Sequence, residues 1–425
     1  DGTSLLLDGT AIGGGGTALE LYAENPSSPT APSATGTNAV AIGSAAIAGG
    51  NQSVALGAAN SSGVQSFSAQ INNTDTAYGA TGANSISIGK SSQATGTQAI
   101  AIGKEARSLG YASIAIGDGS RGNANWSVAT GYNAKSYGDK SHALTNSYAS
   151  GADSFAAAIA NNTSSYGATG ANSVAIGRLA KASGSNSVAI GNFTKAAGAQ
   201  SVVVGYQSND TSTGEGAAAF GRNADAGSPY SAALGPESVT AGSNNYASAL
   251  TRSYASGADS FAAAIANNTS TYGATGANSA AIGKQNKATA TISTSLGGQN
   301  CIASNNYAFA SGNGCTASGY ASTSIGHETN ASEFYTFATG GRAVANLYGK
   351  TAHASGIFSA AGDAQTGTFV LRSDTTDATP EALTTNNSTA GTTNQVILPN
   401  SSAYSFHGTI VARQKASDGT ASAAW

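Results

Sequence analysis

The chain has little of what most globular proteins contain. Its 425 residues include no Met, two Cys, two Trp and seven Pro, and 9% are charged, whereas about 25% is usual. No apolar run approaches the roughly 18 residues of a membrane span, so this segment is not expected to be embedded in a membrane. The net charge of −3 gives no basic footprint, so no nucleic-acid partner is expected. Disorder is also disfavoured, because β-branched residues are frequent and net charge is low.

Glycine is abundant instead, at 56 residues, together with Ala, Ser, Asn and Thr. A polar, nearly uncharged surface is typical of an extracellular fibre rather than of a cytosolic enzyme. The chain opens with Asp1 and has no Met, so we expect a processed or excerpted segment. No signal peptide identifies its route of export.

A 14-residue repeat organises the sequence. Five-residue segments that end in Gly89, Gly103, Gly117 and Gly131 follow one another at that spacing. In each segment β-branched residues occupy positions i and i+2, on one face of a strand, and a small residue faces the other way. Fourteen residues suffice for two short strands and two turns, which is one coil of a β-solenoid. We predict an all-β, parallel β-roll whose Val/Ile stripe holds the rod together, each buried side chain contributing about 1.5–3 kcal/mol.

The predicted organisation has three parts. Residues 1–35 are a connecting segment with a Pro-rich linker, 36–355 a β-roll shaft, and 356–425 a C-terminal β-strand module. Coils of the shaft are interrupted by predicted four-residue insertions near 72–76, 160–165 and 266–271. In the C-terminal part the strands are expected at 368–372, 395–398 and 404–413. Trp425 falls in mid-strand, so the natural protein is expected to continue.

The repeated string carries a family resemblance. Residues 172–177 read Asn-Ser-Val-Ala-Ile-Gly, followed by a Ser/Ala/Gly-rich turn. Over about 36–345 this pattern resembles the head repeats of trimeric autotransporter adhesins. The resemblance implies a left-handed parallel β-roll and a homotrimer of three rolls. The heptad-repeat stalk and the membrane-anchor barrel of that family do not occur between Asp1 and Trp425.

The C-terminal part resembles a different class of protein. Its pattern, at 375–380, 398–400, Phe406, 410–413 and Trp425, is similar to the distal β-module of tail-fibre and other virion proteins of tailed phages. The favoured function is therefore a non-enzymatic, phage tail-fibre-like protein on the virion surface that binds a host or cell-surface glycan or receptor. The alternatives are the head of a bacterial trimeric adhesin on the cell surface, and a polysaccharide depolymerase.

Motifs that suggest chemistry fail on their context. Residues 117–122 match a dinucleotide-binding pattern, but another strand of the repeat follows where a helix is required. The histidines have no spaced partner, and His142 takes the place of a valine that we expect to face the core; the others are His327, His353 and His407. Asp153 and Asp259 hold equivalent places in duplicated units and are expected in turns. The sequence thus predicts no catalytic, metal-binding or cofactor-binding residue.

Three tyrosines are the candidate binding residues. Tyr78, Tyr166 and Tyr272 stand beside the predicted insertions. An aromatic ring on a protruding loop is a platform for a sugar or a receptor, but a ring that seals the edge of a coil is the favoured interpretation.

The only two cysteines lie one repeat apart. Cys301 and Cys315 occupy equivalent positions in successive coils, and stacked coils are about 4.8 Å apart. Because a disulfide needs Cα atoms about 4.4–6.8 Å apart, we predict that the two are bridged.

Overall fold

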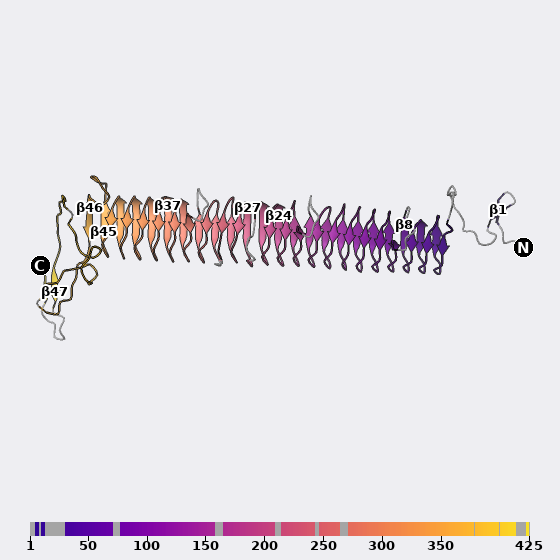
Figure 1. Cartoon of the computed structure of the whole chain (residues 1–425), viewed down its shortest axis with the longest axis horizontal. Coiled ribbons are helices and arrows are strands. Elements are labelled where there is room, and N and C mark those ends of the chain that lie inside the picture. Colours follow the sequence, from indigo (N-terminus) through magenta and orange to yellow (C-terminus); the bar gives the residue numbers. More distant parts are fainter. Residues whose placement is uncertain are drawn as a thin grey trace.

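The computed structural model describes residues 30–70, 77–157, 165–208, 214–242, 246–263, 271–377, 379–398 and 400–413, together with the backbone of strands β1 (Leu5–Leu7), β2 (Thr10–Ile12) and β48 (Ser422–Ala424). Within these residues the regular structure is β-sheet, and no helix is long and apolar enough to span a membrane. Most of the chain forms one extended rod of stacked coils (Figure 1). The prediction of an all-β parallel solenoid is therefore confirmed.

A coil contains one long strand and one short strand, on opposite sides of the rod; between β26 and β27 the described residues include no short strand. The long strands pair in parallel from coil to coil and are β4 (Val40–Ile42), β6 (Val54–Gly57), β8 (Phe67–Gln70), β10 (Ile86–Ile88), β12 (Ile100–Ile102), β14 (Ile114–Ile116), β16 (Val128–Thr130), β18 (His142–Leu144), β20 (Phe155–Ala157), β22 (Val174–Ile176), β24 (Val188–Asn192), β26 (Val202–Tyr206), β27 (Ala218–Arg222), β29 (Ala232–Leu234), β31 (Ser248–Leu250), β33 (Phe261–Ala263), β35 (Ala280–Lys284), β37 (Thr294–Gln299), β39 (Phe309–Asn313), β41 (Thr323–His327), β43 (Phe337–Gly341) and β45 (Thr351–Ala354).

The short strands form a 12-stranded and a 9-stranded parallel sheet. The first comprises β3 (Ser33–Ala34), β5 (Ile47–Ala48), β7 (Asn60–Ser61), β9 (Gly79–Ala80), β11 (Gln93–Ala94), β13 (Arg107–Ser108), β15 (Arg121–Gly122), β17 (Lys135–Ser136), β19 (Tyr148–Ala149), β21 (Gly167–Ala168), β23 (Lys181–Ala182) and β25 (Lys195–Ala196). The second comprises β28 (Asp225–Ala226), β30 (Val239–Thr240), β32 (Tyr254–Ala255), β34 (Gly273–Ala274), β36 (Lys287–Ala288), β38 (Ile302–Ala303), β40 (Thr316–Ala317), β42 (Asn330–Ala331) and β44 (Val344–Ala345).

The register places equivalent residues of successive coils beside each other. Ile100 pairs with Ile114, at the regular spacing of the repeat. Phe67, however, pairs with Val54 on the preceding coil, which is one position short of that spacing, and with Ile86 on the following coil, which is five positions beyond it. The same sequence of a short and a long coil recurs around Phe155 and Phe261. The predicted excess of four residues over two regular coils is thus distributed as a 13-residue coil followed by a 19-residue coil. The predicted insertions themselves lie outside the described residues, apart from positions 165 and 271.

The interior of the rod is made of small side chains, and this corrects the predicted core. Ala101, Ala115 and Ala129 are 0% exposed, whereas Ile116 on the opposite face of the strand is 39% exposed. The reason is the narrowness of the coil: the hydroxyls of Ser108 and the facing Ser113 lie 2.6 Å apart across it. Ala, Ser, Gly and Cys make up most of the interior, and the larger Val203, Asn286 and Gln70 are exceptions among the described residues. The Val/Ile stripe therefore lies on the outer surface, and so does His142, which was wrongly expected to face the core.

The repeat string is explained by the turn that precedes each long strand. Asn172 adopts a left-handed backbone with φ of 53°, which Asn tolerates better than most residues. Ser173 then faces inward and donates a 2.7 Å hydrogen bond to the carbonyl of Gly170. Val174 points outward and Ala175 inward, and Gly177 ends the strand with φ of 122°, a value that L side chains rarely adopt.

The parallel stack ends at β45. The strand β46 (Gln365–Thr368) pairs with it in antiparallel orientation, and the amide of Tyr348 donates to the carbonyl of Thr393, which ties the C-terminal part to the last coils. Among the described residues beyond β46 the strands are only β47 (Val411–Arg413) and β48, besides an isolated bridge between Arg372 and Thr384. The predicted strand at 368–372 is wrong except at Thr368, which ends β46. Those at 395–398 and 404–410 are wrong as well, because alternation does not make a strand without a neighbouring strand to pair with. The side chains of 404–410 are exposed.

The glycines that recur from coil to coil predict that the effect of a substitution on stability depends on its position. At Gly117, with φ of 124°, an added Cβ would lie 2.5 Å from the carbonyl oxygen of Gly131 on the next coil. Gly119, with φ of 67°, has no atom closer than 3.9 Å to such a Cβ. We expect Gly117→Asn to cost about 1–3 kcal/mol through backbone strain and to lower the thermal midpoint measured by circular dichroism. Gly119→Asn is the control and should change it little; equal effects would contradict the explanation.

The narrow interior predicts opposite effects at neighbouring residues. Ala129 is fully buried, whereas Thr130 faces outward between Ile116 and Leu144 of the adjacent strands. Ala129→Leu should therefore overpack the coil and destabilise it by about 1–3 kcal/mol. Thr130→Leu should change the free energy of unfolding by no more than about 0.5 kcal/mol, since leucine resembles the apolar side chains beside it. Urea unfolding of both variants measures the difference, and a tolerated leucine at 129 would refute the narrow interior.

Candidate functional site

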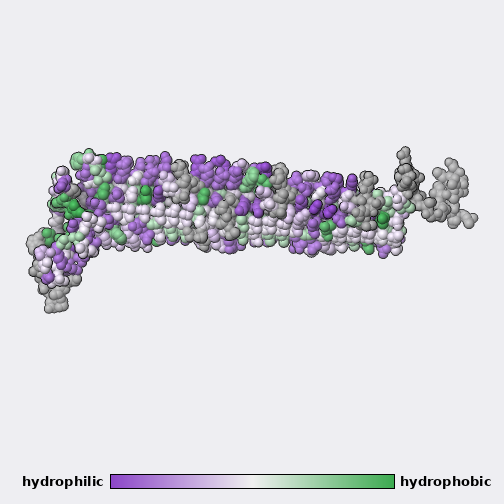
Figure 2. All heavy atoms as spheres, in the orientation of Figure 1, coloured by the Kyte–Doolittle hydropathy of each residue, from purple (hydrophilic) through white to green (hydrophobic). Residues whose placement is uncertain are grey.

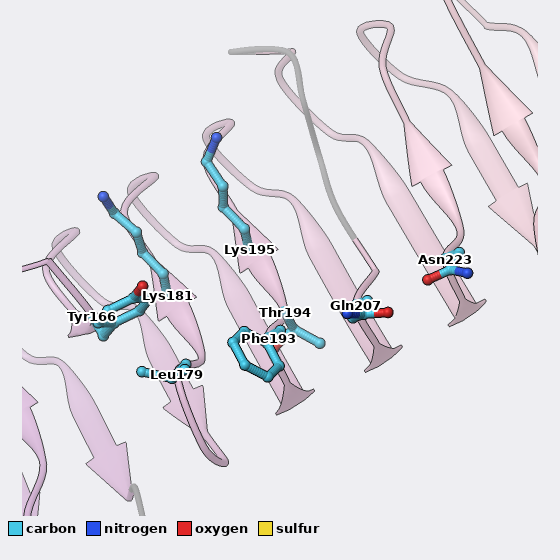
Figure 3. Close-up of a pocket in the computed structure, with 8 residues that line it drawn as sticks. All are labelled: Tyr166, Leu179, Lys181, Phe193, Thr194, Lys195, Gln207 and Asn223. Carbon is cyan, nitrogen blue, oxygen red and sulfur yellow. The ribbon is translucent and has the colours of Figure 1, made fainter. Parts of the chain in front are cut away.

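A shallow groove lies beside Tyr166, one of the three tyrosines singled out from the sequence. Its volume is about 330 Å³ and it extends over several coils near the end of the 12-stranded sheet. Figure 3 shows the eight residues that line it: Tyr166, Leu179, Lys181, Phe193, Thr194, Lys195, Gln207 and Asn223. None of these eight is acidic.

One wall of the groove is a row of turn residues. Leu179, Phe193, Gln207 and Asn223 each occupy the turn between a long and a short strand, with φ between 52° and 56°. Because the backbone repeats, these side chains leave successive coils one above another, as Figure 3 shows. Bulky apolar residues are uncommon in this conformation, and Phe193 is 40% exposed.

The opposite wall is cationic. Lys181 and Lys195 pair directly in the parallel strands β23 and β25, and Figure 3 shows their side chains side by side, extending in the same direction. The guanidinium of Arg178 lies 5.1 Å from the centre of the Phe193 ring, on the turn side of the groove. Two rings and two lysines line this shallow groove, and Arg178 lies against one of the rings. The arrangement suits an elongated anionic ligand that lies across the coils, rather than an enclosed small molecule.

The other two tyrosines occupy equivalent places but have different surroundings. All three rings are half-buried. Next to Tyr272 the ammonium group of Lys287 lies 5.1 Å from the centre of the ring, which is a cation–π contact. Gln93 takes the place of this lysine in the copy with Tyr78, and its side chain donates instead to the carbonyl of Ala77. The three sites are therefore similar in backbone but not in charge, and whether they bind a ligand stays a prediction.

A larger group of exposed and half-buried rings was missed in the sequence. It lies along the turns before β39, β41, β43 and β45, with neighbouring ring centres 5.4–6.4 Å apart, and comprises Tyr307, Tyr320, Phe334, Tyr335 and Tyr348. The available signal was the recurrence of Tyr320, Phe334 and Tyr348 at the regular spacing of the repeat.

The residues considered for chemistry are not assembled into a reactive site within the described part of the chain. The glycine pattern at 117–122 ends in strand β15, and the next element after it is strand β16, so the helix that a phosphate site requires is not there. Asp153 and Asp259 both adopt left-handed turns with φ of 52° and are exposed, as expected for turn residues. Among the described residues no three His, Cys, Asp or Glu side chains are grouped as metal ligands would be. The Nδ1 atom of His353 is hydrogen-bonded to Thr339 on the outer surface.

Cys301 and Cys315 are both fully buried, on adjacent coils of the interior. They are free thiols in this structure, so the disulfide stays a prediction about the oxidised protein. Their mutual hydrogen bond, followed by burial, raises the pKa of Cys301 well above its ordinary value. Cys301 therefore keeps its proton at neutral pH, and only the thiolate is a nucleophile.

Burial predicts slow reaction of the native thiols. Iodoacetamide should modify Cys301 of the folded protein at least about tenfold more slowly than that of the urea-unfolded protein, because access and ionisation are both suppressed. Mild oxidation of the folded protein should reduce the number of thiols titrated after unfolding from two to none. Cys315→Ser is the control, since it must keep one titratable thiol after the same treatment. Equal rates in folded and unfolded protein would contradict burial, and two thiols remaining after oxidation would refute the bridge.

The sequence was also compared with known proteins. The sequence model described as YadA head domain repeat (2 copies) matches residues 34–60, 80–106, 94–120, 168–194, 182–208, 212–238 and 274–300. All of these segments lie in the solenoid. No curated protein matches the chain.

Proposed function

Because segments along the rod match the YadA head domain repeat, the repeat type of trimeric autotransporter adhesin heads, we propose that the protein is a non-enzymatic, homotrimeric attachment fibre displayed outside a cell. The β-roll shaft of 36–355 is its structural body, with the segments 1–35 and 356–425 on either side. The three copies contact one another through the outer face of the long strands, and the fibre binds a cell-surface glycan or receptor.

The observation that carries the trimer is the composition of this outer face. In every long strand from β4 to β45 the first three residues include no Asp, Glu, Lys or Arg. The outward positions hold chiefly Val, Ile, Leu and Phe, of which Ile88, Ile116, Ile176, Ile190 and Ile282 are each 36–39% exposed. Figure 2 shows on its visible face that hydrophilic residues gather along one edge of the rod and that a paler band runs beside them. A continuous apolar stripe of this length far exceeds the patches of a few hundred Å² found on monomers.

Burial of this stripe between copies gives a substantial driving force. Burying a fully exposed Val, Ile, Leu or Phe contributes about 1.5–3 kcal/mol, and a side chain that is 36–39% exposed on one chain gains roughly a third of that. Every long strand from β4 to β43 offers one or two such residues at its outward positions. The interior of a single coil contains mainly Ala and Ser, which bury little apolar surface. Association therefore supplies hydrophobic stabilisation that one chain cannot obtain alone.

The phage tail-fibre interpretation is a second candidate. It is supported by the pattern within 356–425, whereas every segment matched by the family lies before residue 301. Mass spectrometry of the source particle separates the two, because a tail fibre is found among virion proteins and an adhesin in cell envelopes. A depolymerase would lower the viscosity of a polysaccharide solution, and the proposed attachment fibre should leave it unchanged.

The trimer makes a prediction about two faces of the same coils. Sedimentation equilibrium should give three times the mass of one chain. Ile102→Glu with Ile116→Glu places charges in the stripe and should reduce the mass towards that of one chain, because buried unpaired charges cost several kcal/mol. Leu109→Glu with Asn123→Glu adds the same charge to the short-strand face of these coils and should leave the trimer intact. A monomeric wild-type chain with a β spectrum would refute the proposal.

A further inference from the structure

Cations form a column on the outer face of the 12-stranded sheet of short strands. In successive strands Arg107 pairs with Arg121, and Arg121 pairs with Lys135. The next two strands place Tyr148 and then Gly167 in the same column. Lys181 and Lys195 follow in the last two strands. We call Arg107, Arg121, Lys135, Lys181 and Lys195 the cationic stripe. It covers seven successive coils, or about 29 Å at 4.8 Å per coil, and ends in the groove beside Tyr166.

We propose that the cationic stripe binds a linear acidic polysaccharide that runs parallel to the rod axis. This inference rests on the proposed function as an attachment fibre and names the chemistry of its ligand: an extended chain of sugar units that bear carboxylate or sulfate groups.

The first argument is the like charge of neighbours. Residues directly paired on one face of a sheet are close, and equal charges there are destabilising. Neither Arg107 nor Arg121 forms an ion pair with any residue that the structure describes. The column itself and the next outward position after it on each strand hold no Asp or Glu. Glu105, two residues before Arg107, lies in the preceding turn, and its carboxylate contacts Lys104. The chain as a whole has a net charge of −3, so the column is a local segregation of charge.

The second argument is the aromatic rings placed among the cations. Tyr148 fills the column between Lys135 and Gly167, and the ring of Tyr137 packs edge-on against it at 5.4 Å. Tyr166 lies beside Lys181 in the groove (Figure 3). An aromatic ring packs on the apolar C–H face of a sugar, while the neighbouring cation meets its acidic group. A bilayer surface offers no such ring-shaped partner.

The third argument is accessibility and repeat length. The proposed trimer buries the long-strand face, so the short-strand face on the other side of each coil stays open. Successive cations are one coil apart, and a sugar unit in an extended chain advances by a similar length. A polysaccharide with one acidic group per unit therefore meets one cation per coil without bending. A nucleic-acid duplex is too wide to place one phosphate at every coil along a single column.

The test compares two triple variants of the full chain. Arg107→Gln, Arg121→Gln and Lys135→Gln remove three charges of the stripe. Lys90→Gln, Lys104→Gln and Lys140→Gln remove the same charge from the turns at the edges of neighbouring coils. Binding to immobilised polyuronate, dextran sulfate, neutral dextran and duplex DNA is measured over a range of salt concentrations. Circular dichroism and sedimentation confirm that each variant keeps the wild-type fold and mass.

We expect wild type to bind an acidic polysaccharide and not neutral dextran. The stripe variant should lose at least about tenfold in affinity, and the slope of log affinity against log salt should fall by about two, as counterion release requires. The affinity of the edge variant for the acidic polysaccharides should stay within about twofold of the wild-type value. Polyuronate and dextran sulfate together show whether carboxylate or sulfate is preferred.

Three results would overturn the inference: no binding to either acidic polysaccharide, equal losses in the two variants, or tighter binding of duplex DNA than of both polysaccharides. A trimer that adheres to cells but ignores the acidic polysaccharides would remove this ligand while leaving the proposed function intact. A monomeric wild-type chain that still binds the acidic polysaccharides through the stripe would refute the proposed trimer while leaving this ligand intact.

Discussion

The small cross-section of each coil is the constraint on which the rest of this structure depends. Two strands and two turns enclose a space so narrow that serine hydroxyls from its two sides touch, as Ser108 and Ser113 do. Among the described residues, side chains larger than Val or Asn are not fully buried in it. The interior can therefore contribute uniform packing and backbone hydrogen bonds, but little hydrophobic stabilisation of the kind that large side chains provide. Larger apolar residues must lie outside, where they are half-exposed on a single chain.

This constraint divides the outer surface into two faces with different chemistry. Outward positions do not have to fit the interior, so they are free to carry any side chain that their surroundings accept. The first three residues of the long strands are chiefly apolar at their outward positions and include no Asp, Glu, Lys or Arg, which suits contact between copies. Those of the short strands include Arg107, Arg121 and Lys135 on successive coils, which suits a solvated, anionic partner. The turns contribute a third kind of site, as in the row with Leu179 and Phe193.

The sequence predicts the repeat, the parallel stacking and the turns, but it does not predict which face of a strand is the interior. Alternation shows that Ile114 and Ile116 share one face and Ala115 takes the other; it carries no information on the width of the coil. The usual preference of large apolar residues for the core then leads to the wrong face. The cationic stripe was readable from the 14-residue spacing of Arg107, Arg121 and Lys135, whereas the groove was not, because its position depends on the coils of unequal length.

These unequal coils also show why the tyrosine sites are similar without being identical. The extra residues of a 19-residue coil lie between its long and its short strand, so both strands keep their register with the neighbouring coils. The backbone around Tyr78, Tyr166 and Tyr272 is thereby repeated, and any difference in binding must come from the side chains of the adjacent coils. Only beside Tyr166 do two successive short strands present a lysine; beside Tyr272 the strand after Lys287 presents Ile302 instead. Duplication of a stretch of solenoid thus reproduces the backbone around each tyrosine, and the charged side chains of the next coil decide what each copy can bind.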